Sequence, residues 1–447
     1  MSLSCFSQPV SFQFIAKALI SLFLVFGLLG CNESDDSEDG GGSNTPITYT
    51  VSFYELFDLH LAKRVSVEPN TAIELIAGSK TTWYKGGSDT PLSGEYNVTG
   101  NINFYGVKDV IEISDQAGLA SIACGGSKRY ILINDIALSG NWTPLCSAVG
   151  GGYFNGLLQG DFHKITGLNV VWNADRGPSG LFGWLDYPAQ IHNLGVIGAH
   201  VEGAYNVGII AGTIFDDAGY TMGVSLTNSY ATGTVIATPP GKHDNESTYA
   251  GGIVGVKQFL CGAIKGVYFN GSVKASGRGS GIGSAGGIAG SGHATDSYSA
   301  GSVVGDYAGG IAGYGSANRC YSTANVNGIG IAGGIVAQGR SSEYNVDRDV
   351  AINQAISGAT VGRIAGKDAI PCDRWNCANT LVPNIALDSL VPVGSIGSTS
   401  LAGENKTQEE LKQQKTYEDI GWKFGANNDN PWNIDEGSSY PYLYWQK

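Results

Sequence analysis

The residues of this chain whose types and spacing could support catalysis are carboxylates in expected loops and turns. Enzymes that cleave polysaccharides need such acids in close groups, as general acid and base or as calcium ligands. The candidates are Asp216, Asp217, Asp244, Glu246, Asp296 and Asp306, of which Asp244 and Glu246 follow His243. Asp296 falls at a turn position where Asp and Asn side chains usually bond to backbone, which favours a structural role. We therefore assign no catalytic residue.

The histidines show no metal-binding pattern. The six are spread along the chain without the short spacings of metal sites: His60, His163, His192, His200, His243 and His293. The motifs of serine hydrolases, zinc peptidases and phosphate-binding loops do not occur in the sequence either. We expect neither a metal nor an organic cofactor.

A tyrosine recurs at matching positions of a repeated phrase: Tyr230, Tyr268, Tyr298, Tyr321 and Tyr344. If the phrases stack as strands, these rings form a column with a spacing of about 4.8 Å. Residues such as Val267 and Cys320 precede the tyrosines and belong inside, so alternation along a strand points the rings outward. An inward column stays open as an alternative, because tyrosine also forms cores. An outward column is either a ligand-binding strip or a surface covered by the aromatic C-terminal tail.

A glycine-bounded phrase sets the architecture. GGIVG at 251–255 returns as GGIAG at 286–290 and 309–313 and as GGIVA at 333–337, and the two tightest copies define a unit of about 23 residues. A unit this short suits one coil of a β-solenoid, with about three short strands and their turns, and is too short for a pair of helices. We predict an all-β fold, a right-handed parallel β-helix.

These paired phrases, with NSYATG ending at Gly233, resemble the GLUG motif of bacterial cell-surface proteins. Segments 130–145, 154–168 and 179–185 resemble the lead-in coils of such proteins, and 421–446 resembles their usual close. The resemblance implies an adhesin-like surface protein. It does not identify a ligand, because a fold does not fix a function.

The N-terminus predicts export and lipidation. An uncharged run at 18–30 follows Lys17 and ends in Leu28-Leu29-Gly30-Cys31, which resembles the lipobox of bacterial lipoproteins. The resemblance implies a signal peptide at 1–30, acyl chains such as palmitate on Cys31 and a stable membrane anchor. Asn32 in place of aspartate favours the outer membrane, with the protein facing either the periplasm or the cell exterior. The acidic Gly/Ser segment 31–46 is expected to be a tether.

The rest of the chain divides into three parts. Residues 47–108 alternate apolar and polar residues and resemble the small β-grasp repeats of internalin-like proteins, either as a spacer or as a binding module. Residues 109–370 form the solenoid. Residues 371–447 hold a disulfide loop, a short helix at 407–414 that opens with a capping box of Thr407 and Glu410, and an aromatic C-terminal cap.

An exported protein is expected to pair its cysteines. We predict disulfides between Cys124 and Cys146 and between Cys372 and Cys377. Cys261 and Cys320 are two coils apart, about 9.6 Å if stacked directly, which exceeds the usual reach of about 7 Å. We therefore predict a buried free thiol at Cys320.

The charge and the repeats together favour a binding function. The net charge of −13 argues against nucleic acid and anionic lipid as partners. We predict a monomeric, membrane-anchored binding or adhesion module for an extracellular glycan or protein. A β-helical polysaccharide-active enzyme and a passive spacer of the cell surface are the alternatives.

Overall fold

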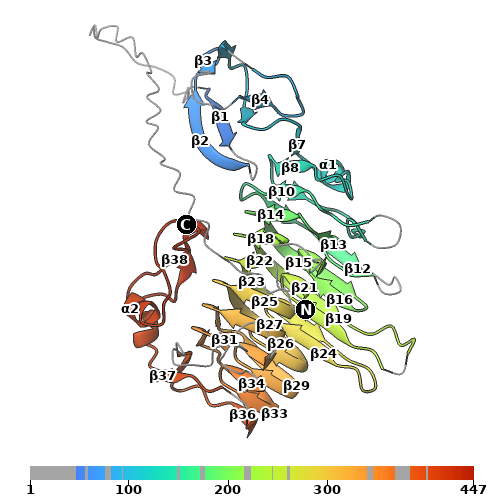
Figure 1. Ribbon diagram of the computed structural model, residues 1–447, viewed down its shortest axis with the longest axis vertical. Coiled ribbons are helices and arrows are strands. Elements are labelled where there is room, and N and C mark those ends of the chain that lie inside the picture. Colours follow the sequence, from blue (N-terminus) through green and yellow to red (C-terminus); the bar gives the residue numbers. More distant parts are fainter. Residues whose placement is uncertain are drawn as a thin grey trace, which may run out of the picture. The chain divides into compact units, whose positions relative to one another are not determined.

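The structure is a computed structural model that divides into two compact units between Val110 and Ile111 (Figure 1). The predicted boundary at residue 108 lies close to this point. The structure describes residues 47–55, 59–75, 82–92, 94–147, 152–171, 177–215, 223–243, 245–258, 262–339, 346–367, 383–398 and 401–446. The predicted signal peptide and tether, residues 1–46, lie outside this set.

The N-terminal unit is a small mixed β-sheet. Its order is β2-β1-β6-β4, and the central pair β1 and β6 is parallel whereas the outer pairs are antiparallel. Val51, Val98 and Phe104 are fully buried, and Phe53 stacks on Phe104 at 5.3 Å. The strands are β1 (Tyr49–Glu55), β2 (His60–Val67), β3 (Ala72–Leu75), β4 (Tyr84–Lys85), β5 (Gly94–Asn97) and β6 (Ile102–Tyr105), with β3 and β5 paired apart from the main sheet.

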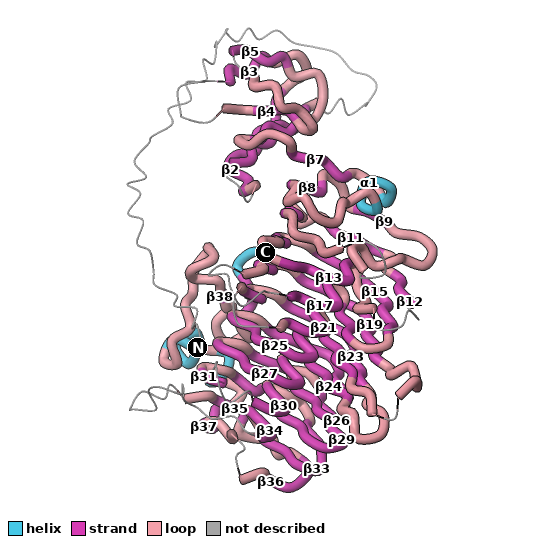
Figure 2. Tube along the Cα trace, turned by 45° about the vertical axis from the view of Figure 1, so that its right-hand side comes forward, coloured by secondary structure: helices cyan, strands magenta, loops and turns pink. Residues whose placement is uncertain are grey.

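The second unit is a stack of strands that forms a β-solenoid (Figure 2). All pairings between the named strands β7 to β37 are parallel, as in β19–β23 and β25–β27. One sheet contains β7 (Val110–Ile113), β8 (Arg129–Leu132), β10 (Leu157–Gln159), β13 (Phe182–Asp186), β14 (Gln190–His192), β17 (Ala211–Phe215), β18 (Ser225–Thr227), β21 (Val254–Lys257), β22 (Ala263–Lys265), β25 (Ala289–Thr295), β27 (Ala312–Asn318), β30 (Val336–Gly339), β31 (Val346–Asp347) and β34 (Ala365–Lys367).

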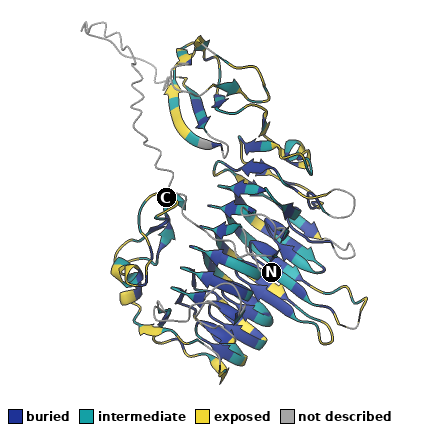
Figure 3. Cartoon of the chain, in the orientation of Figure 1, coloured by how far each residue is buried: buried dark blue, intermediate teal, exposed yellow. Residues whose placement is uncertain are grey.

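The opposite sheet contains β9 (Ile136–Ala137), β11 (Lys164–Thr166), β12 (Asn169–Val171), β15 (Gly195–Gly203), β16 (Asn206–Gly208), β19 (Tyr230–Ala237), β20 (Thr248–Gly251), β23 (Tyr268–Ala275), β24 (Gly283–Gly286), β26 (Tyr298–Gly309), β28 (Tyr321–Ser322), β29 (Asn325–Gly333), β32 (Val350–Ala351), β33 (Ile356–Gly362), β35 (Ile385–Leu387), β36 (Val393–Ile396) and β37 (Glu404–Lys406). Figure 3 shows the strands of the stack as mainly buried.

The tightest coil differs from the expected three short strands. It consists of β26, with 12 residues, and β27, with 7, joined by two sharp corners. Ser299 meets Ser322 in the next coil, 23 residues on, so the predicted period is correct. In several other coils an insertion divides a long strand into two, as between β19 and β20 and between β21 and β22.

The repeated glycines mark the corner where the two sheets approach most closely. A Cβ atom on Gly309 would lie 2.7 Å from the amide nitrogen of Ala337, and one on Gly313 would lie 2.8 Å from that of Ala285. No side chain fits at either point. Ile288 and Ile311, between these glycines, point into the core and are fully buried. The phrase GGIAG is therefore a steric requirement of this corner.

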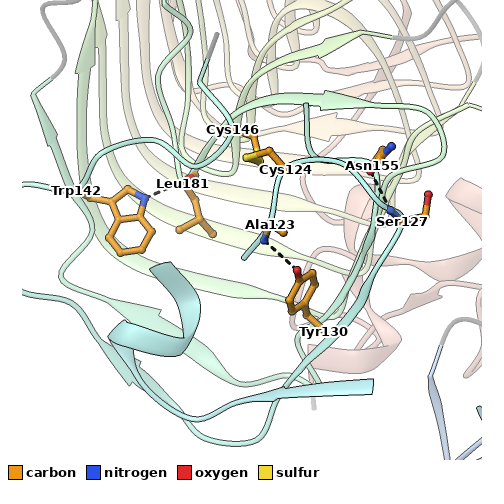
Figure 4. The surroundings of a disulfide bond; sticks show 8 residues. All are labelled: Ala123, Cys124, Ser127, Tyr130, Trp142, Cys146, Asn155 and Leu181. Carbon is orange, nitrogen blue, oxygen red and sulfur yellow. Dashed lines mark hydrogen bonds between the residues drawn. A yellow bond between two sulfur atoms is a disulfide. The ribbon is translucent and has the colours of Figure 1, made fainter. Parts of the chain in front are cut away.

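The first coil carries a short helix and a disulfide. Helix α1 (Gln116–Ala120), which the sequence analysis missed, begins after Asp115, whose side chain accepts the Gly118 N–H at 2.8 Å. The predicted bond between Cys124 and Cys146 is present, with a Cα–Cα separation of 5.4 Å (Figure 4). Cys372 and Cys377, the other predicted pair, lie outside the described residues.

After β37 the chain forms a small aromatic module, drawn in red in Figure 1. The helix predicted at 407–414 is wrong in its bounds, because extended backbone at Gln413 separates a 3-10 turn from the helix that follows. The capping box itself is present, with Thr407 N–H donating to Glu410 Oε2 and Glu410 N–H to Thr407 Oγ1. The elements are η1 (Glu410–Lys412), α2 (Gln414–Glu418), β38 (Trp432–Asn433), β39 (Tyr442–Leu443) and η2 (Tyr444–Gln446). No helix in the described part of the chain is long and apolar enough to cross a membrane.

Candidate functional site

Four of the predicted tyrosines form a continuous stack, which we call the tyrosine ladder: Tyr230, Tyr268, Tyr298 and Tyr321. Successive ring centroids are 4.9, 5.0 and 4.8 Å apart, and the ring planes differ by no more than 10°. The residues before them are fully buried in the solenoid, so the rings project outward as strand alternation requires. Tyr344 lies outside the described residues.

The C-terminal module, residues 407–446, covers most of the ladder, and we call it the clasp. Trp432 lies 5.9 Å from Tyr321 and 6.5 Å from Tyr298, and only 5% of Tyr321 is exposed. Tyr321 Oη donates to the Pro441 carbonyl at 2.8 Å, and Gln446 Nε2 donates to Tyr298 Oη at 2.6 Å. Of the two alternatives for an outward column, a ligand-binding strip along the whole ladder does not agree with these contacts. The clasp occupies that surface, as the alternative interpretation predicted.

Polar contacts fix the clasp along several coils. Asn228 Nδ2 donates to Asn428 Oδ1, and Lys265 Nζ donates to the Asn428 carbonyl, both at 2.9 Å. Further along the stack, Trp422 Nε1 donates to the Arg348 carbonyl at 2.6 Å. The clasp therefore joins coils that are otherwise connected only through their neighbours.

Burial keeps the covered phenols neutral. It raises the pKa of Tyr298 to about 12 and the pKa of Tyr321 well above its ordinary value. The ladder therefore carries no charge at physiological pH, and the clasp binds it through ring contacts and hydrogen bonds.

The ladder ends at Tyr230, where the clasp leaves aromatic surface exposed. Gly195 takes the tyrosine slot of the preceding coil, and Lys164 takes it one coil earlier. Trp445 lies 6.0 Å from Tyr230 on one side and 5.8 Å from Phe162 on another. Phe162 is 41% exposed. We call Phe162, Tyr230 and Trp445 the ladder end.

An acid and an imidazole border the ladder end. Asp135 Oδ1 accepts the Lys164 N–H at 2.9 Å and lies 3.1 Å from His163 Nδ1. Partial burial would raise the pKa of Asp135, but the Lys164 amide and His163 outweigh it and lower the pKa. The carboxylate is therefore ionised at neutral pH. Burial and the charge of Asp135 both raise the pKa of Tyr230.

The described members of the acid set have structural partners. Glu246 accepts the Tyr205 hydroxyl and the amides of Gly241 and His243. Asp306 accepts the amides of Gly277 and Gly283, and Asp296 binds the Arg319 guanidinium at 2.6 Å. Asp216, Asp217 and Asp244 lie outside the described residues. The described residues contain no group of three or more His, Cys, Asp or Glu side chains that could hold a metal ion.

Cys320 is a buried free thiol, as predicted. Its Sγ lies 3.5 Å from the carbonyl oxygens of Ala294 and Asn318, and burial raises its pKa well above the ordinary value. Cys261 and the predicted lipidation site Cys31 lie outside the described residues.

Phe162, His163 and Asp135 are site residues that sequence reasoning missed. The phrase Gly160-Asp161-Phe162 carries a turn signal that marks the position, but no local pattern connects it with Trp445 at the far end of the chain.

Comparison with known proteins gives one similar fold. No family model matches the chain, and no curated protein sequence matches it. A crystal structure at 1.30 Å of a Bacteroides ovatus protein, provisionally named an immunoglobulin A1 protease, is 22% identical with a TM-score of 0.46. It covers 76% of this chain and 92% of the other. Nothing about the activity of this chain follows from that likeness.

Proposed function

We propose that this chain is a lipid-anchored protein of the outer membrane that binds an extracellular glycan or surface protein through its solenoid. The anchor is Cys31, which follows Leu28 and the apolar run of the N-terminus. The acidic tether then carries the folded units away from the membrane.

The observation that supports binding is the ladder end. Its aromatic rings remain partly exposed where the clasp stops, and an ionised carboxylate lies beside them. Aromatic rings offer large contact areas with few rotatable bonds, so little side-chain entropy is lost when a partner binds. A rigid stack holds these rings in fixed positions before the partner arrives.

The anchor is tested by the Cys31→Ser variant of the full chain. We expect this variant to leave the membrane fraction and become soluble, because it cannot be acylated. Retention in the membrane at the wild-type level would contradict the anchor.

Binding is tested with the soluble Cys31→Ser protein on arrays of glycans and cell-surface proteins. We expect saturable binding to one ligand class. A folded protein that binds nothing on either array would overturn the binding function and favour the passive spacer.

A further inference from the structure

The ladder end contains an aromatic residue with a left-handed backbone conformation. Phe162 has a φ of 62° and follows Asp161 with a φ of 46°, both in the left-handed region. Bulky side chains rarely adopt this conformation, which glycine or asparagine tolerates better. Hydrogen bonds from Phe162 N–H to the Asn193 carbonyl and from His163 N–H to the Gly160 carbonyl, both 2.8 Å, hold the turn.

The ring of Phe162 gains only part of the burial that would offset this strain, because 41% of the residue is exposed. Its ring plane lies at 32° to that of Trp445, and Trp445 in turn lies at 28° to Tyr230. Trp445 therefore adjoins both Phe162 and Tyr230, and its ring is inclined to each of them. Strain at an exposed residue is typical of a site that a ligand completes.

Asp135 provides a hydrogen-bond acceptor next to His163, the residue that follows Phe162. Its side chain is 62% exposed, and both of its hydrogen bonds are made by Oδ1. Among the described residues, no donor meets Oδ2. His163 and the Lys164 amide fix the orientation of the carboxylate, so Oδ2 is held ready to accept hydroxyl groups.

The sign of this charge restricts the ligand. A carboxylate accepts hydrogen bonds from sugar hydroxyls, whereas a second carboxylate brought next to it is repelled. A sugar ring carries an apolar face of C–H groups and a rim of hydroxyls, which match the rings and the acid. An acidic sugar matches the rings but not Asp135.

We propose that the ladder end binds one neutral hexopyranose residue of a glycan, with its apolar face on Phe162 and Trp445 and its hydroxyls donating to Asp135. This inference rests on the proposed function, and it identifies the ligand class and the site.

The test uses the soluble Cys31→Ser full chain and measures binding of neutral hexose tetrasaccharides by calorimetry and by tryptophan fluorescence. We expect Phe162→Asn to weaken binding at least tenfold, because asparagine suits the left-handed backbone but lacks the ring. The melting temperature of this variant should equal or exceed that of the parent. Asp135→Asn should weaken binding at least fivefold.

Tyr153→Ala is the matched control, because Tyr153 is 42% exposed, and it should bind as the parent does. Equal binding by folded Phe162→Asn, or equal affinity for a tetrasaccharide of glucuronic acid, would overturn this site and leave the proposed function standing if other glycans bind. Failure of the parent protein to bind any partner on the arrays would overturn both.

Discussion

At corners along the ladder column and its continuation, buried backbone amides face the following coil. A left-handed residue makes each corner, as at Asn228 and Arg319, and the next residue is buried. In four corners a side chain from the following coil accepts the inward N–H: Ser229 for Leu194, Ser297 for Val267, Asp349 for Cys320 and Asn384 for Asp349. Small polar residues therefore occupy an inward column because buried amides need partners.

Asp349 predicts a pH-dependent stability. Its Oδ1 accepts the Cys320 N–H, its Oδ2 is buried without a partner, and burial raises its pKa well above the ordinary value. The folded protein thus retains a proton that the unfolded chain loses above pH ~4, so this residue lowers the free energy of unfolding as pH rises through that range. We expect the free energy of unfolding of Asp349→Asn to rise relative to that of the wild type by about 1.4 kcal/mol per pH unit above pH ~4. This rise should stop at the pKa of Asp349 in the folded protein. Urea unfolding at several pH values measures the difference, and a difference independent of pH would contradict the assignment.

We expect truncation of Tyr321 and truncation of Tyr230 to lower the free energy of unfolding by different amounts. Tyr321 is almost fully buried and donates to Pro441, so Tyr321→Ala should cost about 3 kcal/mol or more. Tyr230 is only partly buried, and Tyr230→Ala should cost about 1 kcal/mol. Denaturant unfolding of both variants measures this. Equal costs would mean that the clasp does not cover the Tyr321 end of the ladder in solution.

Glycine and alanine determine the geometry of the strands. In one inward column, Ala250, Ala285, Ala308 and Ala332 are all fully buried, so the two sheets lie close together near the glycine corner. The residues before these alanines are Tyr249, Ser284, Tyr307 and Ile331, and the residues after them are glycines. The elements are thus thin and rigid, and insertions occur between strands without disturbing the stack.

Substitution at the corner tests this geometry. Gly309→Ala should destabilise the protein by about 3 kcal/mol, because its Cβ atom would meet the backbone of Ala337 and Ala312. Gly118→Ala in α1 is the control, since a Cβ there would lie 3.5 Å from Asp115 and Ile113, an ordinary contact. This variant should be neutral or stabilising by up to ~1 kcal/mol. Thermal unfolding compares the two variants. A mild effect at Gly309 would show that the corner can widen.

In the molecule as a whole, the clasp adds a contact that repeat proteins otherwise lack. Stacked coils interact mainly with their neighbours, so each coil can open with limited effect on distant ones. The clasp forms its own apolar cluster, which includes Tyr321, Val350, Ile385 and Trp432, and spans several coils. It should therefore make these coils open together.

Trp432→Ala tests this coupling. Trp432 is fully buried and lies 4.5 Å from Trp422, so its loss should cost about 3 to 5 kcal/mol within the clasp. In hydrogen exchange, β26, β28 and β32 should lose protection together, whereas β8 and β10 near the first coil should keep theirs. A uniform loss of protection, or no loss beyond the clasp, would contradict the coupling.

Local patterns in the sequence were enough for the parallel β-solenoid, the 23-residue period, the bond between Cys124 and Cys146 and the buried thiol of Cys320. They favoured an outward direction of the tyrosines and left the inward direction open. Strand alternation and corner glycines depend on residues that are close in the chain or one coil away. Both therefore produce a repeating pattern in the sequence. Only the tertiary structure decided what faces the tyrosines. Tyr321 meets Pro441 and Phe162 meets Trp445 across long separations in the chain, and such contacts depend on how the clasp folds back over the stack. The residues that make these contacts follow no period in the sequence. The clasp therefore covers a column of tyrosines that could otherwise have bound a ligand, and exposed aromatic surface remains only at the end of the tyrosine ladder.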